Sequence, residues 1–136
     1  MADSLDALEQ EIGDYLTGQG TATTFGTGNA WLALYTTPPG EDGTGGVEVS
    51  GNAYARQQIS ATNMAPTTTL GVATNDVAIT FPTASGGNWG IITDVGICSA
   101  STLGTIGAVT TLAAPKTVDD GDTFEFAIGD FSVTVT

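Results

Sequence analysis

The chain has 136 residues, enough for one ordinary domain, and its fifteen acidic and two basic residues give a net charge of -13 at pH 7. No histidine is present, which excludes Ser-His-Asp and Cys-His catalytic sites and histidine-based zinc sites. The two bases, Arg56 and Lys116, are too few for a nucleic-acid-binding surface, an anionic membrane would repel the chain, and a single cysteine, Cys98, excludes an internal disulfide.

Residues 1–18 are predicted to form an amphipathic helix that docks on another surface. Apolar residues recur there at spacings of three and four and share one helix face: Leu5, Leu8, Ile12 and Leu16. Asp3 or Ser4 can cap the start of the helix, and Gly18 and Gly20 end it. Because so short a helix is marginal alone in water, we expect its apolar face to lie on the domain or on a neighbouring subunit.

Residues 19–136 are predicted to form one all-β domain, a jelly-roll-like antiparallel β-sandwich. After Gly28 the apolar period changes to two, and short runs are separated by Gly, Pro, Asn and Asp turns. The expected strands cover residues 30–35, 47–49, 54–59, 76–81, 89–98, 105–112, 124–128 and 131–135. No alternation of strands with helices is visible, so a parallel α/β sheet is not expected.

Alternation within these strands predicts which side chains form the core. The expected core residues are Val77, Ile79 and Phe81, then Trp89, Ile91, Val95 and Ile97, then Phe124, Phe126 and Ile128, and finally Phe131, Val133 and Val135. Trp31 and Trp89 are expected in the core rather than as exposed sugar-stacking platforms. Cys98 is expected to be a small buried apolar residue.

Three aspartates could form a weak cation site. Asp119, Asp120 and Asp122 offer the oxygen ligands that calcium prefers, but the regular spacing and distant glutamate of an EF-hand are missing. A tight hairpin turn around Gly121 explains the same residues without a metal. We therefore expect the turn, with no metal and no other cofactor.

Glycoside hydrolysis by a pair of carboxyl groups is the one enzymatic reaction that the composition allows. Asp76 starts a predicted strand, and Asp94 lies mid-strand with a parity opposite to that of Ile91 and Val95. An outward surface acid is the simpler interpretation of Asp94, so no enzymatic activity is expected. The glycine-rich acidic loop at 38–46 lacks the Gly-Lys-Ser/Thr of a phosphate-binding loop and predicts a surface loop or one ordered at a subunit contact.

Arg56 is the remaining candidate for an interface. It lies between Tyr54 and Gln58 in a predicted strand, and fifteen acids are available to it. We expect an ion pair, either buried or across a subunit interface. Together with the apolar face of residues 1–18, Arg56 completes the set of interface candidates.

Three stretches of the β region carry a family resemblance. They are AWLALYTTP at 30–38 followed by VSGNAYARQ at 49–57, FPTA at 81–84 followed by WG at 89–90 and DVGI at 94–97, and PKTV at 115–118 followed by GD at 121–122 and FEF at 124–126. In this order they resemble small virion proteins of tailed bacterial and archaeal viruses. Those proteins are labelled tail fibre or virion structural proteins, and some act as capsid decoration proteins. The resemblance covers residues 30–136 and leaves the N-terminal helix outside it.

This resemblance implies a non-enzymatic virion structural protein, made in the host cytoplasm. We expect a capsid decoration protein that forms a homo-oligomer, a trimer, on a shell of major capsid protein. A tail or tail-fibre component in contact with other tail proteins is the alternative. A carbohydrate-binding module for host glycans is the second alternative, and exposed aromatic side chains in a concave patch would favour it.

The acidity adds an expectation about the host. A chain poor in lysine and rich in aspartate, threonine and glycine is typical of proteins from halophilic organisms, where salt screens the repulsion between equal charges. We therefore expect a virus of a halophilic host, with an ordinary acidic surface as the alternative.

Overall fold

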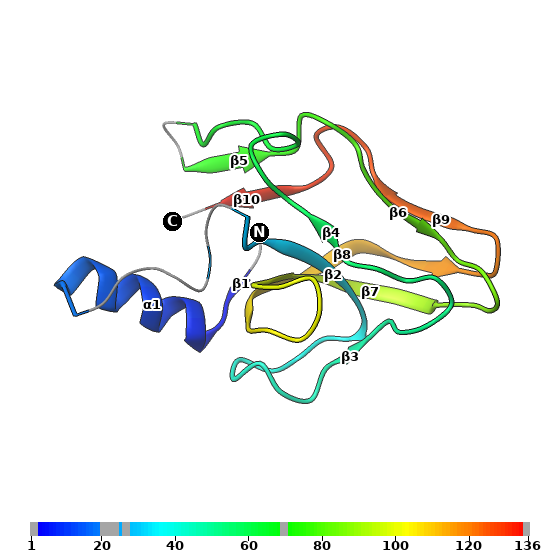
Figure 1. Ribbon diagram of the computed structural model, residues 1–136, viewed down its shortest axis with the longest axis horizontal. Helices are drawn as coiled ribbons and strands as arrows, with labels where there is room; N and C mark the ends of the chain where they lie inside the picture. The colour runs from blue at the N-terminus through cyan, green and yellow to red at the C-terminus, as the bar shows by residue number, and fades with distance from the viewer. Residues whose placement is uncertain (1–2, 20–24, 26–27, 69–70, 135–136) are drawn as a thin grey trace.

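The computed structural model describes residues 3–19, 25, 28–68 and 71–134, and these form strands and one helix (Figure 1). The elements in chain order are β1 (Asp3–Ser4), α1 (Asp6–Thr17), β2 (Trp31–Thr37), β3 (Val47–Glu48), β4 (Gln57–Gln58), β5 (Val72–Thr74), β6 (Ile79–Thr83), β7 (Gly90–Cys98), β8 (Ile106–Val118), β9 (Thr123–Phe126) and β10 (Ser132–Thr134). The expected all-β fold with a short N-terminal helix is confirmed.

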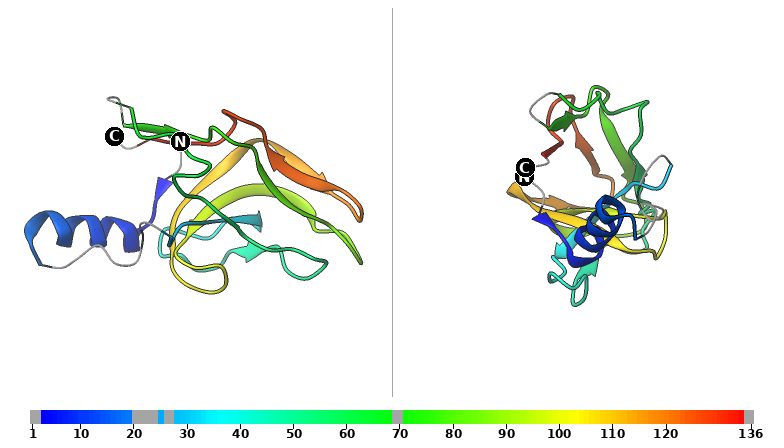
Figure 2. Two further views of the ribbon diagram at one scale, coloured as in Figure 1. Left: turned by 45° about the horizontal axis from the view of Figure 1, so that its top comes forward. Right: turned by 90° about the vertical axis from the view of Figure 1, so that its left-hand side faces the viewer.

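The strands form two layers, and within each layer the neighbouring strands of the described residues pair antiparallel. In the described part of the chain, one layer is a six-stranded sheet in the order β1-β8-β7-β2-β3, with β4 also paired to β2. The other layer consists of two separate pairs, β6 with β9 and β5 with β10. Figure 2 shows the large sheet as one curved layer with these pairs across it and with α1 extending from one end. This arrangement confirms the predicted sandwich.

The hydrophobic core lies between the two layers. β2 contributes Leu32 and Leu34, and β7 contributes Ile92 and Val95. Aromatic rings form a row in this core whose neighbouring centroids are 5.1 to 6.3 Å apart, in the order Trp89, Tyr54, Phe81, Phe124, Phe126 and Phe131. Edge-to-face and offset ring contacts add stability beyond the area they bury, so the row links Trp89, which is bonded to β8, to the rings of β6 and β9.

The N-terminal segment joins the large sheet before the helix begins. Asp3 and Ser4 form β1 against β8 instead of capping α1, so the predicted cap was wrong. Leu5 is the N-cap residue; its N–H donates to the carbonyl of Gly107 at 2.8 Å, and its side chain is buried. Gly18, with a φ of 74°, ends the helix as predicted, because a left-handed residue lets its N–H bond back to the last turn.

Gly20 lies outside the described residues. None of the described helices is long and apolar enough to cross a membrane.

A shift of register in β7 reverses the predicted face of one residue. The pairing of β7 with β8 shifts between Ile92 and Asp94, where one residue of β7, Thr93, lies opposite four residues of β8, 112–115. Ile92 is therefore fully buried in the core with Val95, while Ile91 is 55 % exposed. The prediction that Ile91 lies in the core was wrong because simple alternation does not include a bulge.

Other strands also differ from their predicted limits, and β8 continues to Val118 although the predicted strand ends at residue 112. β6 begins at Ile79, so Val77 lies in the preceding loop and is 49 % exposed. β9 ends at Phe126, so Ile128 lies in the following turn and is 67 % exposed. β4 is shorter than the predicted strand at 54–59, β5 was not predicted, and Val135 lies outside the described residues.

The buried side-chain amide of Asn75 joins the loop after β5 to the turn between β9 and β10. The side chain of Asn75 donates to the carbonyls of Val77 and Ala127 at 3.0 and 2.9 Å and accepts from the N–H groups of Gly129 and Phe131 at 3.1 and 2.9 Å. Asn75 is 1 % exposed, so these bonds replace water completely. They set the turn that brings Phe131 into the core.

Trp89→Ala is expected to lower the free energy of unfolding by about 3–5 kcal/mol, because it removes a large core side chain. The Trp89 ring is 6 % exposed and its Nε1–H donates to the carbonyl of Asn52 at 2.9 Å. Urea denaturation followed by circular dichroism measures the change. Ile91→Ala is the control, with an expected loss below about 1 kcal/mol at an exposed position. Equal losses in the two variants would contradict the core position of Trp89.

Candidate functional site

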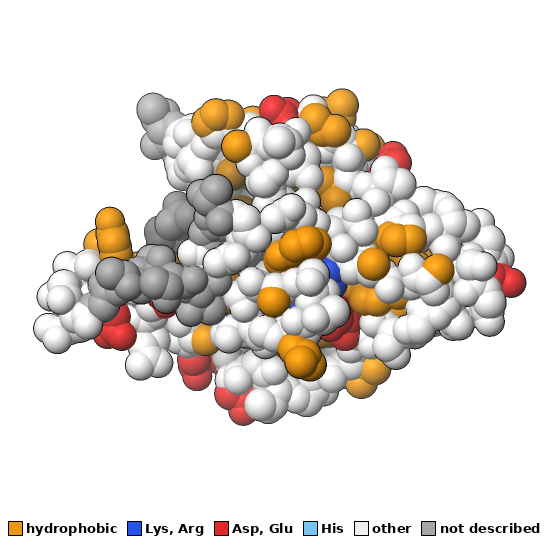
Figure 3. All heavy atoms as spheres, viewed as in Figure 1, with side chains coloured by type: hydrophobic (Ala, Val, Ile, Leu, Met, Phe, Trp, Pro, Cys, Tyr) orange, Lys and Arg blue, Asp and Glu red, His pale blue; other side chains and the backbone are white. Residues whose placement is uncertain are grey.

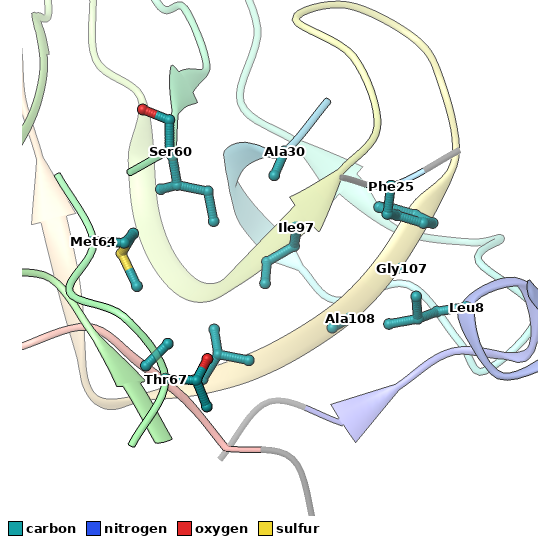
Figure 4. A pocket seen from close by; sticks show the side chains of 12 residues that line it. Leu8, Phe25, Ala30, Ser60, Met64, Thr67, Ile97, Gly107 and Ala108 are labelled. Atoms are coloured by element: carbon teal, nitrogen blue, oxygen red, sulfur yellow. The ribbon is translucent and has the colours of Figure 1, made fainter. Parts of the chain in front are cut away.

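An apolar pocket of about 510 Å³ opens at the end of the sandwich nearest α1 (Figure 4). Leu8 reaches it from α1, Ile97 from β7, and Met64 from the loop before β5. Phe25 borders it beside Gly107, where an added Cβ would come within 2.6 Å of the phenylalanine ring. The absence of a side chain at Gly107 therefore allows Phe25 to lie against β8.

The predicted apolar face of residues 1–18 is divided between the domain and solvent. Leu5 is buried and Leu8 lines the apolar pocket. Ile12 and Leu16 are 47 % and 75 % exposed, and Tyr15 beside them is 62 % exposed. Tyr15 was missed as an interface candidate, although it continues the three-four spacing of Leu5, Leu8 and Ile12. The outer half of the helix thus presents apolar side chains that the described part of the chain leaves uncovered.

Carboxylates gather where α1 meets the acidic loop at 38–46. Side-chain oxygens of Asp6, Glu9 and Glu41 come within 4.8 Å of one another at exposed positions. Among the described residues this is the group of acids best placed to hold a cation. In the same loop, hydrogen bonds from the backbone and side chain of Thr44 lower the pKa of Asp42.

The aspartates after β8 form the predicted turn. The N–H of Asp122 donates to the carbonyl of Asp119, and the Asp122 carboxylate accepts the N–H of Asp119 at 3.0 Å. Asp120 accepts the N–H of Gly86 at 3.0 Å. Gly121 has a φ of 90°, which glycine adopts without strain. Two of the three weak metal candidates therefore use carboxylate oxygens to accept backbone N–H groups, Asp122 within its own turn and Asp120 from the loop after β6.

Arg56 forms the expected ion pair, and its partner is Glu48 of β3. Nε and Nη2 of Arg56 donate to the two oxygens of Glu48, each at 2.7 Å, in a bidentate pair. The side chain of Arg56 is 7 % exposed and that of Glu48 is 25 % exposed. The hydrogen bonds to Glu48 raise the pKa of Arg56, so the guanidinium stays charged throughout the accessible pH range.

Arg56 also holds the loop between β7 and β8. Its Nη1 donates to the carbonyls of Ala100 and Leu103 at 2.7 and 2.8 Å. Leu103 has a φ of 55° and is 86 % exposed. The guanidinium therefore fixes a loop that carries an uncovered leucine in a left-handed backbone conformation, which is costly for a residue that has a Cβ atom.

Tyr54 extends the network toward the core. Its hydroxyl accepts the N–H of Leu34 at 2.9 Å and donates to Glu48 at 2.9 Å, while its ring packs edge-on against Trp89. Burial raises the pKa of Tyr54, so the hydroxyl remains a donor. Glu48, Tyr54 and Arg56 thus connect β2, β3 and the 99–104 loop.

A second pocket, of about 470 Å³, lies beside this network. Trp31, Tyr54 and Leu103 contribute apolar lining, and Ser50 and Thr102 contribute polar lining. Trp31 is partly buried at this pocket, whereas Trp89 is buried in the core. The prediction of a buried tryptophan is therefore confirmed fully for Trp89 and only in part for Trp31.

Asp76 and Asp94 are not brought together as a catalytic pair. Asp76 is exposed in the loop after β5. Asp94 lies in β7 of the large sheet, is 3 % exposed, and accepts the hydroxyl of Thr111 at 2.8 Å. The prediction that Asp94 is an outward surface acid was wrong, because the N-terminal segment and the 38–46 loop line the pocket above it.

Cys98 is buried as predicted, on the face of the large sheet that lies away from the main core. It packs with Ala33 and Tyr35, and its sulfur is 3.6 Å from the Tyr35 hydroxyl. Burial raises the pKa of the Cys98 thiol and the pKa of Tyr35, so both groups stay neutral. The pair packs within this small cluster and offers no reactive thiolate.

Comparison with known proteins gives a match to a family model over nearly the whole chain. The model of the family described as Podophage GP4 fiber I protein gp80 matches residues 4–134. No curated protein matches the chain. The matched range contains the helix, both layers of the sandwich and the Arg56 network.

Arg56→Gln is expected to lower the free energy of unfolding by about 2–3 kcal/mol, because it removes the cation that pairs with Glu48 and frees the 99–104 loop. Thermal or urea denaturation measures this loss. Lys116→Gln removes the other base, which is exposed and lies 5.1 Å from the Phe124 ring centroid. That control is expected to cost at most about 1 kcal/mol. If Arg56→Gln lowers the free energy of unfolding no more than Lys116→Gln does, the hydrogen bonds of Arg56 do not stabilise the fold.

Proposed function

The chain belongs to the podophage GP4 fiber I protein gp80 family, a family of tailed-phage structural proteins, and we propose that it is a structural subunit of a tail fibre. The observation that carries the proposal is the match of a fibre family over residues 4–134. The expected capsid decoration role has less support, because the family description names a fibre. The tail-fibre alternative is therefore the better interpretation of a virion structural protein.

The proposed subunit acts by shape and contact, without catalysis. The chain has no histidine, and the one carboxylate pair considered for hydrolysis is split between an exposed loop and a buried strand. The Arg56 network and the Asn75 amide instead rigidify loops around a compact core. Such rigid surfaces suit a protein that repeats in an assembly.

Within this function, residues 1–18 serve as the docking segment and residues 19–136 as the body. Leu5 and Leu8 anchor the segment to the sandwich. Ile12 and Leu16 face solvent, and a helix of this length gains stability when such a face is covered. We propose that a neighbouring virion protein covers it and that the subunit forms homotrimers.

Locating the protein in purified virions tests this function. Immunogold labelling, or a map of the virion by electron microscopy, is expected to place the copies on tail fibres. Ile12→Ser/Leu16→Ser is expected to fold normally, because both side chains are exposed, and to lower the number of copies per virion severalfold. Ile128→Ser, exposed in the turn after β9, is the control that keeps normal incorporation. Copies spread over the capsid shell would contradict the fibre proposal.

The net charge of -13 supports the proposal that the virus infects a halophilic host. The Debye length is about 30 Å in 0.01 M salt and about 3 Å in 1 M salt, so removing salt lets the acidic surfaces of neighbouring copies repel. We expect the oligomer to dissociate as salt falls, before the core unfolds. Light scattering and tryptophan fluorescence along a falling NaCl series measure the two events. An oligomer that is unchanged from molar to millimolar salt would contradict the halophilic proposal.

A further inference from the structure

We propose that the surface around Leu103 is the place where one copy of this chain contacts a second copy. This Leu103 surface consists of the exposed Leu103 side chain and the adjoining pocket of about 470 Å³, between the 50–56 segment and the 99–104 loop. The inference rests on the proposed function, since a fibre subunit must contact other copies or other virion proteins. It adds the position and the partner of one such contact.

The choice of leucine at position 103 is unfavourable for an isolated subunit. Its side chain is 86 % exposed, and its φ of 55° lies in the region that glycine and asparagine adopt more readily. Neither solubility nor the stability of the turn therefore favours leucine there. A contact that buries this side chain would supply the compensating stabilisation.

The loops on both sides of the pocket are rigidly held. Arg56 bonds to the carbonyl of Leu103, and on the opposite side the turn contains Asn52 and Ala53 with φ of 50° and 66°. Asn52 is fixed by two hydrogen bonds: its side-chain amide donates to the carbonyl of Asn88, and its backbone carbonyl accepts the indole N–H of Trp89. Among the described residues, the non-glycine residues at positive φ are these two and Leu103. Backbone strain is thus concentrated around one pocket, which is preorganised for binding.

Charge indicates that a second copy is the partner. The charged residues that line the pocket are Glu48 and Arg56, which neutralise each other in the ion pair. The remainder of the chain carries the whole net charge of -13. On the face shown in Figure 3, most acidic side chains lie toward the margins, and the blue of a base appears near the centre. Two equally acidic copies repel least where their surfaces are neutral, whereas a basic partner would be drawn to the acidic regions.

The shape of the surface also suits contact between copies. An exposed leucine projects from one rim of a pocket that is larger than a leucine side chain and is partly lined by Trp31 and Ala55. The Leu103 side chain of one copy can therefore enter the pocket of the next. A contact of this kind repeats around a closed ring such as a trimer.

Leu103→Asn tests the inference without endangering the fold, because asparagine tolerates the left-handed conformation and the side chain contacts solvent in the isolated subunit. We expect an unchanged or higher melting temperature and self-association at least about tenfold weaker, measured by sedimentation in molar salt. Ile128→Asn, at another exposed position, is the control with wild-type self-association. A Leu103→Asn protein that self-associates like the wild type, or a wild-type chain that stays monomeric, would overturn the inference.

Mixing two variants that each carry one added cysteine gives an independent measurement. Leu103→Cys from one preparation and Ala55→Cys from another are expected to form a disulfide-linked dimer under mild oxidation. Cys98 does not interfere, because it is fully buried and burial raises the pKa of its thiol. Absence of the mixed dimer would count against the Leu103 surface. That result leaves the fibre proposal intact, since virion labelling tests it separately.

Discussion

The bidentate ion pair between Arg56 and Glu48 is the interaction on which the organisation of this surface depends. Strand ladders join β2, β7 and β8 over most of their length, but they do not reach the 99–104 loop or the turn before β4. The guanidinium bonds to Glu48 and to two loop carbonyls, and Tyr54 carries the network to the backbone of Leu34. One buried cation thus holds together segments that are distant in sequence, and removing it would leave a carboxylate and two carbonyls without their partner.

Much of the fold could be predicted from the sequence, because glycine, proline and aspartate turns divide the chain into strands and alternation fixes most faces. Alternation failed where the backbone departs from regular pairing. The bulge between Ile92 and Asp94 exposes Ile91, and a bulge depends on the neighbouring strand rather than on local sequence. Asp94 was misplaced for a related reason, since Leu5 and the 38–46 loop, which are distant in sequence, line the pocket at its side chain.

The candidate site could be predicted only in part. A lone arginine among fifteen acids indicated an ion pair, but the choice of Glu48 depends on how β3 pairs with β2. Leu103 was missed, although a single large apolar residue before a glycine in a serine- and threonine-rich turn is a usable signal. The N-terminal helix was correctly identified. Its apolar spacing did not reveal that Leu5 is buried against the β-sandwich while Leu16 is exposed.

The scarcity of bases constrains how this protein can assemble. Arg56 is committed to the interior, so of the two bases only Lys116, exposed beside the ring of Phe124, is left to contact an acidic neighbour. Contact between copies must then depend on apolar side chains and shape in a neutral region, with salt screening the charges around it. The exposed half of α1 is flanked by acids and suits a partner of different charge, whereas the Leu103 surface suits a second copy. If both proposals hold, two surfaces of different character on one small domain would allow a subunit to join its own copies and its neighbours in the virion at the same time.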